Sequence, residues 1–310
     1  MMSGVDHLTA AAVAWLLASD EPAVRSLARR DLLDEQVAPA DGSGPWMKAL
    51  LDWDPAIHPY RKWTGAHWRL ASVVELGVPP TDERTGDMVE RVLTWQTGTT
   101  YRKLLVVDGL PRRHASMEGN ALAAVCRLGL AADPRARLIA ESLVEWQWPD
   151  GGWNCDPGAT HRSSFHETFL PMWALHEYAA ATGDGAAAEA ASRAAELLLE
   201  HGVFRSLRTG EVINKRWLEP RYPPYWHYDF LQALLLLARI GKVRDPRAEE
   251  ALDELERQRL PDGRWRPKGF WWKPPGSTTT PEAVDWGRGG PNEMLTLNAL
   301  RILKAARRLT

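Results

Sequence analysis

Apolar positions recur with a period of 3.6 residues along most of the chain, and the periodic segments come in pairs. In the last three pairs the first segment is charged on one face, whereas the second is apolar nearly all round. A helix that is apolar on every side must be surrounded by protein, so each repeat is predicted to place an outer helix before an inner one. The pairs are 83–96 with 114–130, 133–147 with 163–183, 183–202 with 225–241, and 245–259 with 291–307, preceded by a weaker pair, 44–53 with 67–78.

The ends of these segments carry the residues that start and stop helices. Two outer segments begin with Asp-Pro, an N-cap followed by proline at the first helical position, and the inner segments end at glycines, where a left-handed cap is expected. Connections from outer to inner segments are long, so loops are predicted to gather at the N-terminal ends of the inner helices, and long ordered loops are usually functional. The residues are Asp133–Pro134 and Asp245–Pro246 at the starts, and Gly77, Gly129, Gly183 and Gly241 at the ends.

No strand alternation of useful length interrupts this pattern, so the sequence predicts an all-α protein with a single domain over 1–310. Two arrangements suit paired helices: an open α-solenoid, and a closed α/α toroid, a barrel of about five to six pairs of inner and outer helices. Closure is favoured because the segment 1–44 supplies two further helices that would complete a ring formed by the repeats in 45–310. No polar capping repeat is evident at the C-terminus, which also favours the toroid.

Composition narrows the possible partners. The 310 residues carry a formal net charge of −2 and only short basic clusters, so no nucleic acid is expected as a partner. Two cysteines do not form a disulfide framework, and the apolar run 8–19 is too short to cross a bilayer and lacks the basic flank of a signal peptide. The expected location is cytoplasmic, with at most peripheral membrane contact through the tryptophan-rich loop 269–292. The oligomeric state is not indicated.

Tryptophan is enriched, with 16 residues against 5 phenylalanines and 6 tyrosines, and part of the excess belongs to a repeated motif. The pattern Gln-x-x-x-Gly-x-Trp spans 147–153, just after an outer segment, and a version with one added residue spans 258–265. It resembles the QW motif of terpene cyclases of the squalene-hopene and oxidosqualene type. The glycines allow a tight turn, and the Gln and Trp side chains can satisfy groups at the end of the outer helix, so the motif itself is predicted to be scaffold.

The resemblance implies the α/α toroid fold, which those cyclases share with protein prenyltransferases. The chain lacks the Asp-x-Asp-Asp motif that supplies the initiating proton in such cyclases, and it offers one toroid where they have two. The first hypothesis for function is still a terpene-cyclase-like enzyme, a cyclase, isomerase or lyase that converts a small, largely apolar, isoprenoid-like substrate by proton transfer. Indole rings lining the cavity would stabilise developing positive charge.

Two inner segments start with the same pattern, His-x-x-Phe-Leu, in HETFL (166–170) and HYDFL (227–231). Asp229 with His227 is the first candidate for the acid, because burial among aromatic residues would keep a carboxyl protonated near neutral pH, and Glu167 with His166 is the second. The alternative is that both histidines are core residues bonded to the loop backbone. The expected substrate wall comprises Trp226, Tyr225, Tyr228, Trp173, Glu118, His114, Trp272 and Trp286. Taken by itself, the carboxylate of Glu118 is more often a cap or dipole partner at a helix N-terminus.

Zinc is the alternative chemistry. The first hypothesis needs no cofactor or metal, but Cys155 and Asp156 precede His166, and His227 follows one repeat later, so these four residues form a possible zinc set. Protein prenyltransferases and related toroid cyclases hold zinc with such residues, which would make the chain a zinc-dependent transferase or cyclase. A third hypothesis is a non-catalytic protein that binds an isoprenoid or a peptide.

Overall fold

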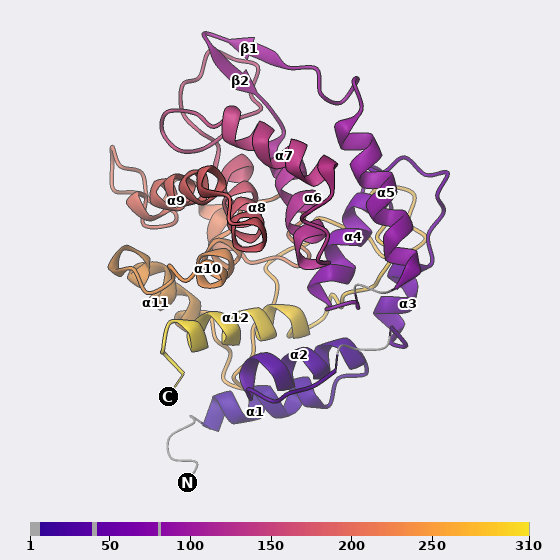
Figure 1. The fold of residues 1–310 in the computed structure, drawn as a ribbon. Coiled ribbons are helices and arrows are strands. Elements are labelled where there is room, and N and C mark those ends of the chain that lie inside the picture. Colours follow the sequence, from indigo (N-terminus) through magenta and orange to yellow (C-terminus); the bar gives the residue numbers. More distant parts are fainter. Residues whose placement is uncertain (1–6, 39–41, 80–81, 310) are drawn as a thin grey trace.

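The protein is mostly helical, as the sequence predicted. The computed structural model describes residues 7–38, 42–79 and 82–309, and within them it contains twelve α-helices and one hairpin of two short strands (Figure 1). The odd-numbered helices are α1 (His7–Leu17), α3 (Pro45–Leu51), α5 (Glu83–Thr97), α7 (Pro134–Glu145), α9 (Gly185–Glu200) and α11 (Glu249–Arg257). The even-numbered helices are α2 (Pro22–Leu32), α4 (Ala66–Glu75), α6 (Ala115–Arg127), α8 (Phe165–Thr182), α10 (Phe230–Arg239) and α12 (Glu293–Ala305). Two 3-10 helices are η1 (Lys215–Leu218) and η2 (Pro246–Ala248).

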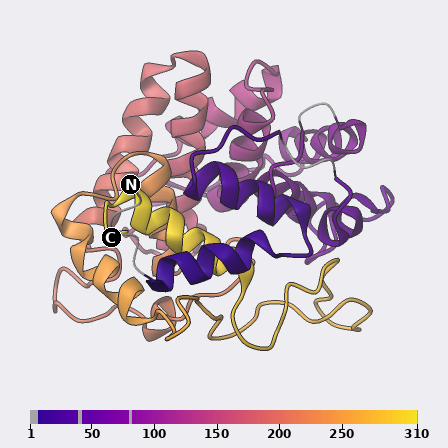
Figure 2. The ribbon, with the colours of Figure 1, turned by 90° about the horizontal axis from the view of Figure 1, so that it is seen from below.

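The even-numbered helices from α4 to α12 are the most buried ones, whereas α2 buries only one face. Every residue of α6 from Ala115 to Cys126 is buried, as is every residue of α10 from Phe230 to Leu237, because these helices are apolar on nearly all sides. Helices α4, α6, α8, α10 and α12 contact one another in that order. Helix α12 also packs against both α1 and α2, so the last helix of the chain meets the first two (Figures 1 and 2).

The predicted helix ends are confirmed. The side chains of Asp133 and Asp245 each accept a hydrogen bond from the backbone N–H two residues on, as N-caps do, and a proline follows each of them. The inner helices are followed by glycines with positive φ, from 75° to 77°, at Gly77, Gly129, Gly183 and Gly241. The helix bounds also place long loops before α8, α10 and α12, at the end where the even-numbered helices begin.

Two local predictions were wrong. Strands β1 (Leu105–Val107) and β2 (Leu110–Arg112) form an antiparallel hairpin where no strand was expected, because Asp108 and Gly109 both take positive φ, as a two-residue hairpin turn requires. The helix predicted from residue 225 begins only at Phe230, since Tyr225 has a φ of 53° and Asp229 caps the helix.

The two QW turns connect neighbouring repeats. The indole N–H of Trp153 donates to the carbonyl oxygen of Leu143 at the end of α7, at 2.9 Å, and Trp265 does the same to Leu255 at the end of α11. The side-chain amide of Gln147 donates to the carbonyl oxygen of Ala190 in α9 at 2.8 Å. These contacts satisfy helix carbonyls and tie one outer helix to the next, which is the scaffold role that was expected.

The helices of the described part of the chain do not include one that is both long enough and apolar enough to span a membrane.

Candidate functional site

Two residues at the starts of α6 and α8 meet a cysteine from the loop between α7 and α8. His114 directly precedes α6, Glu167 lies in the first turn of α8, and Cys155 follows the first QW turn. One nitrogen, oxygen or sulfur atom of each residue lies within 4.8 Å of the others, and Nδ1 of His114 is 3.8 Å from Oε1 of Glu167. We call these three residues the mouth cluster, and the mouth is the end of the molecule at which the even-numbered helices begin.

The fold holds the carboxylate of Glu167 in place. Its Oε2 accepts a hydrogen bond from the backbone N–H of Ser116, at 2.8 Å, in the first turn of α6. Burial opposes ionisation of Glu167, but the nearby imidazole of His114 and the hydrogen bond from Ser116 outweigh burial and hold the pKa of this carboxyl below its usual value. The same contact with Glu167 raises the pKa of His114. The cluster thus pairs a buried carboxylate with an exposed imidazole.

The chemistry of the mouth cluster suits zinc. Burial, with a further contribution from Glu167, raises the pKa of Cys155 to about 12, so the sulfur is a thiol when no cation is near. A coordinated thiol loses its proton outright, which a divalent cation would bring about here. Imidazole nitrogen, cysteine sulfur and carboxylate oxygen are zinc ligands, and the ligands of one tetrahedral ion lie about 3.5 Å apart, so the cluster would contract by about 1 Å. The three residues could supply three of the four ligands that zinc prefers.

The zinc set expected from the sequence was different, and only Cys155 of that set lies in the mouth cluster. Asp156 stabilises a local turn, in which its Oδ1 accepts a backbone N–H two residues on. Nδ1 of His166 accepts the backbone N–H of Tyr228 at 2.8 Å, which fixes the loop before α10. The imidazole and carboxylate of the cluster come from residues to which the sequence assigned other roles.

His227 lies between two indole rings. Its ring centre is 3.7 Å from that of Trp271 and 4.0 Å from that of Trp226, and both pairs are stacked. Burial lowers the pKa of His227 to about 3, so the ring is neutral at ordinary pH. This stack joins the tryptophan-rich loop to the segment that precedes α10, which is the core role that the sequence left open for this histidine.

Asp229 is the N-cap of α10. Its Oδ1 accepts the backbone N–H of Gln232 at 2.9 Å, and its Oδ2 accepts that of Arg221 at 3.3 Å. Burial raises the pKa of Asp229 to about 7, in the direction the sequence predicted. The carboxyl therefore combines a structural hydrogen-bonding role with a perturbed pKa.

A small aromatic cavity lies between the even-numbered helices. Its volume is about 60 Å³, which is room for a few water molecules. Trp173 and Tyr225, two of the expected wall residues, line it, whereas Asp229, His227 and His166 are not among the described residues that do. Its other lining residues include Trp68, Phe169, Tyr222, Asn120, Gln232 and Asn298.

The remaining expected wall residues make structural contacts. The hydroxyl of Tyr228 donates to the backbone carbonyl oxygen of Val203 at 2.5 Å. The indole N–H of Trp272 donates to the backbone carbonyl oxygen of Tyr222 at 3.0 Å. Glu118 is buried and paired with Arg113, and Trp286 packs edge-on against Trp46.

Glu282 is a buried acid that the sequence pattern did not single out. The hydroxyl of Tyr225 donates to its Oε2, its Oε1 accepts the backbone N–H of Ala283 at 2.6 Å, and burial raises its pKa to about 7. The sequence carried a signal, because Glu282 shares a two-residue period with the apolar residues Val284 and Trp286. All three side chains are buried in the structure. An extended segment with this period places the carboxyl on the same side as the apolar residues.

A comparison with protein-family models finds none that matches this chain, and a comparison with curated proteins finds no matching sequence. The function is therefore argued from the site.

Proposed function

We propose that the protein is a zinc-dependent enzyme of the transferase or cyclase type that acts on a thiol substrate. The observation that carries this proposal is the convergence of His114, Cys155 and Glu167 within 4.8 Å at the mouth. Three protein ligands with an open fourth position are typical of catalytic zinc, whereas structural zinc has four protein ligands. The exposed side chain of His114 makes that position accessible from solvent.

The ligand charges favour a thiol over water as the activated group. Zinc bound here would lower the pKa of a substrate thiol at the open position and so generate the nucleophile. Cys155 and Glu167 contribute two negative charges and His114 none, so they would neutralise a divalent ion. A neutral site lowers the pKa of a bound water less than a cationic site does, and it leaves a bound thiolate more reactive. The N–H of Ser116 keeps Glu167 oriented toward the site.

A groove at the start of α8 offers space for the rest of the substrate, although His114, Cys155 and Glu167 are not among the residues that line it. It has a volume of about 750 Å³ and runs past the start of α8, where Phe165 and His166 line it together with Leu207 and Trp217. The mix of apolar and polar lining suits an extended substrate such as a peptide or a thiol with an apolar tail. The long loop that precedes α10 forms part of the groove wall, which supports a binding role for this loop in the proposal.

The closed toroid is part of this proposal. The packing of α12 on α1 and α2 supports a ring, because it joins the last repeat to the first helices of the chain. The even-numbered helices would then form an inner barrel whose mouth carries the zinc site. Two free cysteines, Cys126 and Cys155, agree with a reducing, cytoplasmic location.

Metal analysis tests the proposal directly. Protein purified without added metal is expected to hold close to one zinc ion per chain by elemental analysis, and Cys155→Ser and His114→Ala are expected to lose it. His227→Ala is the control, because that ring lies in the indole stack and should keep the metal. A wild-type protein that binds neither Zn²⁺ nor Co²⁺ in titrations would overturn the assignment.

Cobalt substitution tests the thiol step. The cobalt protein is expected to show a thiolate charge-transfer band in the near ultraviolet, which Cys155→Ser removes. Addition of glutathione as a probe thiol should increase this band, because a second thiolate occupies the open position. A spectrum that glutathione leaves unchanged would indicate a closed, structural site and would favour the binding-protein hypothesis.

Proton transfer by Asp229, the terpene-cyclase-like hypothesis, is the second candidate. It is favoured by the pKa of about 7, which leaves much of the carboxyl protonated near neutral pH. Two observations weigh against it: both carboxylate oxygens already accept backbone N–H groups, and the aromatic cavity of about 60 Å³ is far smaller than an isoprenoid. If Asp229→Asn abolished turnover at unchanged zinc content, the evidence would favour this candidate.

A further inference from the structure

A second charged site lies at the opposite end of the even-numbered helices, where they end. A pocket of about 250 Å³ opens there between α2, α4, α6, α10 and α12. The distance from the mouth is about 20 Å along α6, since thirteen residues at about 1.5 Å each separate His114 from the pocket. We call it the arginine pocket; its charged lining residues are Arg30, Arg127, Arg239, Arg301, Asp31 and Glu75.

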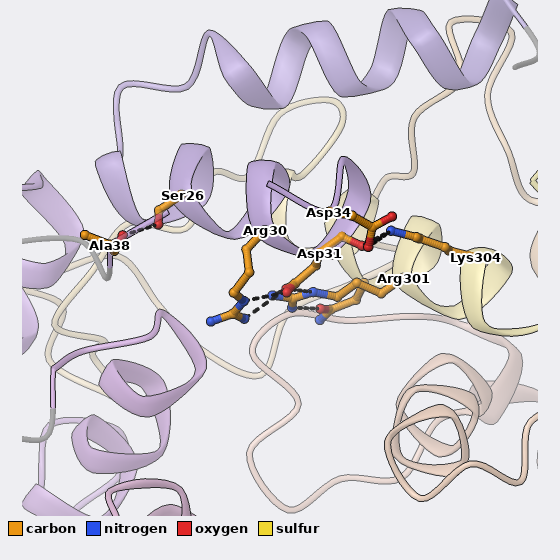
Figure 3. Close-up of polar contacts among 8 residues, drawn as sticks. Ser26, Arg30, Asp31, Asp34, Ala38, Arg301 and Lys304 are labelled. Carbon is orange, nitrogen blue, oxygen red and sulfur yellow. Dashed lines mark hydrogen bonds and ion pairs between the residues drawn. The ribbon is translucent and has the colours of Figure 1, made fainter. Parts of the chain in front are cut away.

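Both carboxylates of the pocket are already bound by arginines. Asp31 accepts hydrogen bonds from Arg30 on one side and from Arg301 on the other (Figure 3). Glu75 forms a bidentate pair with Arg239, with N–O distances of 2.7 and 2.6 Å. Both carboxylates therefore already accept charge-assisted hydrogen bonds, and Arg127 acts on Glu75 through its charge alone.

Arg127 is the guanidinium that remains. Within the part of the chain that the structure describes, it makes no hydrogen bond, and its nearest carboxylate oxygen is Oε1 of Glu177 at 3.9 Å. That oxygen already accepts the indole N–H of Trp173 at 2.7 Å. With Glu177 included, four arginines face three carboxylates, so one positive charge is in excess. Burial lowers the pKa of Arg127, and the charge of Arg239 lowers it further.

Helix dipoles explain only part of this arrangement. Arg127 and Arg239 lie in the last turns of α6 and α10, where a positive charge is favourable. The interaction of Arg127 with the helix dipole, however, does not require its guanidinium to line an open pocket together with other arginines. The excess charge and a guanidinium that has only a long ion pair with Glu177 and a contact with the ring of Trp173 instead fit a site that an anion completes.

We propose that the arginine pocket binds a small molecule that carries a phosphate group. One planar guanidinium can bind both oxygens of a carboxylate, as Arg239 binds Glu75, whereas arginines from four different helices suit a group with oxygens in several directions. The volume of about 250 Å³ leaves room for more than the phosphate itself. This inference concerns the end of the molecule away from the mouth and does not depend on the zinc proposal.

Binding of inorganic phosphate and of pyrophosphate tests the site. Calorimetric titration at constant ionic strength, with sodium chloride as the reference salt, is expected to show saturable binding of pyrophosphate to the wild-type protein. Arg127→Gln should weaken that binding at least tenfold, and it should fold normally because Arg127 makes no hydrogen bond to lose. Arg30→Gln, on the exposed rim of the pocket, should weaken it as well. The matched control is Arg137→Gln on α7, an arginine outside the pocket, which should bind as the wild type does.

The outcomes separate the two explanations of the arginines. Loss of binding in Arg127→Gln, with the control unaffected, supports the site. If the wild type shows no saturable binding of either anion, or if Arg127→Gln binds pyrophosphate as tightly as the wild type, the arginines serve the helix ends only and the proposal is wrong. A melting temperature that pyrophosphate raises equally in all variants would also overturn the proposal.

Discussion

The two ends of the even-numbered helices differ in both loops and charge. At the mouth, long loops bring Glu167 and Asp229 to the first turn or the cap of a helix, and each carboxyl accepts backbone N–H groups. At the opposite end, short turns follow the helices, and Arg127 and Arg239 lie in their last turns. The signs agree with the helix dipole, which favours negative charge at N-termini and positive charge at C-termini.

The difference also separates two kinds of site. Side chains at the mouth come from loops that diverge in length and sequence, so the mouth can gather a cysteine, a histidine and a carboxylate at one point. Side chains at the opposite end come from the helices themselves, so their spacing is fixed by the packing of the helices. Chemistry is therefore expected at the mouth, and recognition of a fixed charge at the arginine pocket.

The largest effect is expected from the turns that build the mouth. Trp153→Ala and Trp265→Ala should each lower the free energy of unfolding by about 3–5 kcal/mol, because each removes a fully buried indole and its hydrogen bond to a helix carbonyl. Denaturant unfolding measures the loss, with the partly exposed Trp53→Ala as a milder control. An unchanged melting temperature in either variant would contradict the scaffold role of the QW turns.

The ion pair near the opposite end comes next. Arg239→Met should cost about 3 kcal/mol, because it leaves the buried carboxylate of Glu75 without its bidentate partner. The cost should stay at the lower end of the usual range, since Arg127 and Arg301 still act on that carboxylate. The double variant Glu75→Met/Arg239→Met should be more stable than Arg239→Met alone. Simple addition of the two single effects would show that the pair is not coupled.

Most of the fold was predictable because helix periodicity and capping are local. Ten of the observed α-helices fall in the paired segments, and the Asp-Pro starts and glycine ends are where the pattern placed them. The start of α10 was misplaced because the residues of YWHY are apolar enough to extend the helical pattern backward from Phe230. The left-handed backbone of Tyr225 and the N-cap at Asp229 instead make the helix begin at Phe230. Local sequence does not show which of several apolar residues will leave the helix.

The candidate site was less predictable because it depends on two loops and the start of a helix at once. Cys155 and Glu167 were each singled out, but His114 was assigned to a substrate wall, and nothing in its own surroundings in the sequence relates it to residues 41 and 53 positions later. The buried Glu282 was missed for a different reason, since its alternation with Val284 and Trp286 is a strand-like pattern inside a loop. Contacts between long loops are set by the packing of the helices that carry them.

The acid at the mouth gives a pH dependence. The pKa of Asp229 is about 7 in the folded protein against an ordinary value of 3.8, so its contribution to stability is fully present at low pH and is lost as the pH rises from about 4 through 7. Asp229→Asn cannot ionise and keeps a capping oxygen, so it should match the wild type near pH 4 and exceed its stability near pH 8. The gain should be at least about 1 kcal/mol, because one pKa unit corresponds to about 1.4 kcal/mol.

Denaturant unfolding across this pH range measures the gain, and Asp229→Ala is the second variant. It should lose about 1 kcal/mol at low pH through loss of the cap. Equal pH profiles for the wild type and Asp229→Asn would mean that Asp229 is ionised in the folded protein throughout, which would also remove the observation that favours it as a proton donor.

The smallest effect is expected from the turns at the opposite end. Gly129 has a φ of 75° and open space around the position where a Cβ would lie, so Gly129→Ala should cost only the strain of a left-handed alanine, about 1 kcal/mol. Gly263 in the second QW turn also has a positive φ, but a Cβ there would lie 2.1 Å from the carbonyl oxygen of Leu8, so Gly263→Ala should cost clearly more. Asparagine tolerates the left-handed region better than alanine, and Gly129→Asn should therefore recover part of the loss. Equal losses of unfolding free energy at Gly129 and Gly263 would show that the turns at both ends are equally constrained. The tighter packing of the turn at the mouth would then have no energetic consequence.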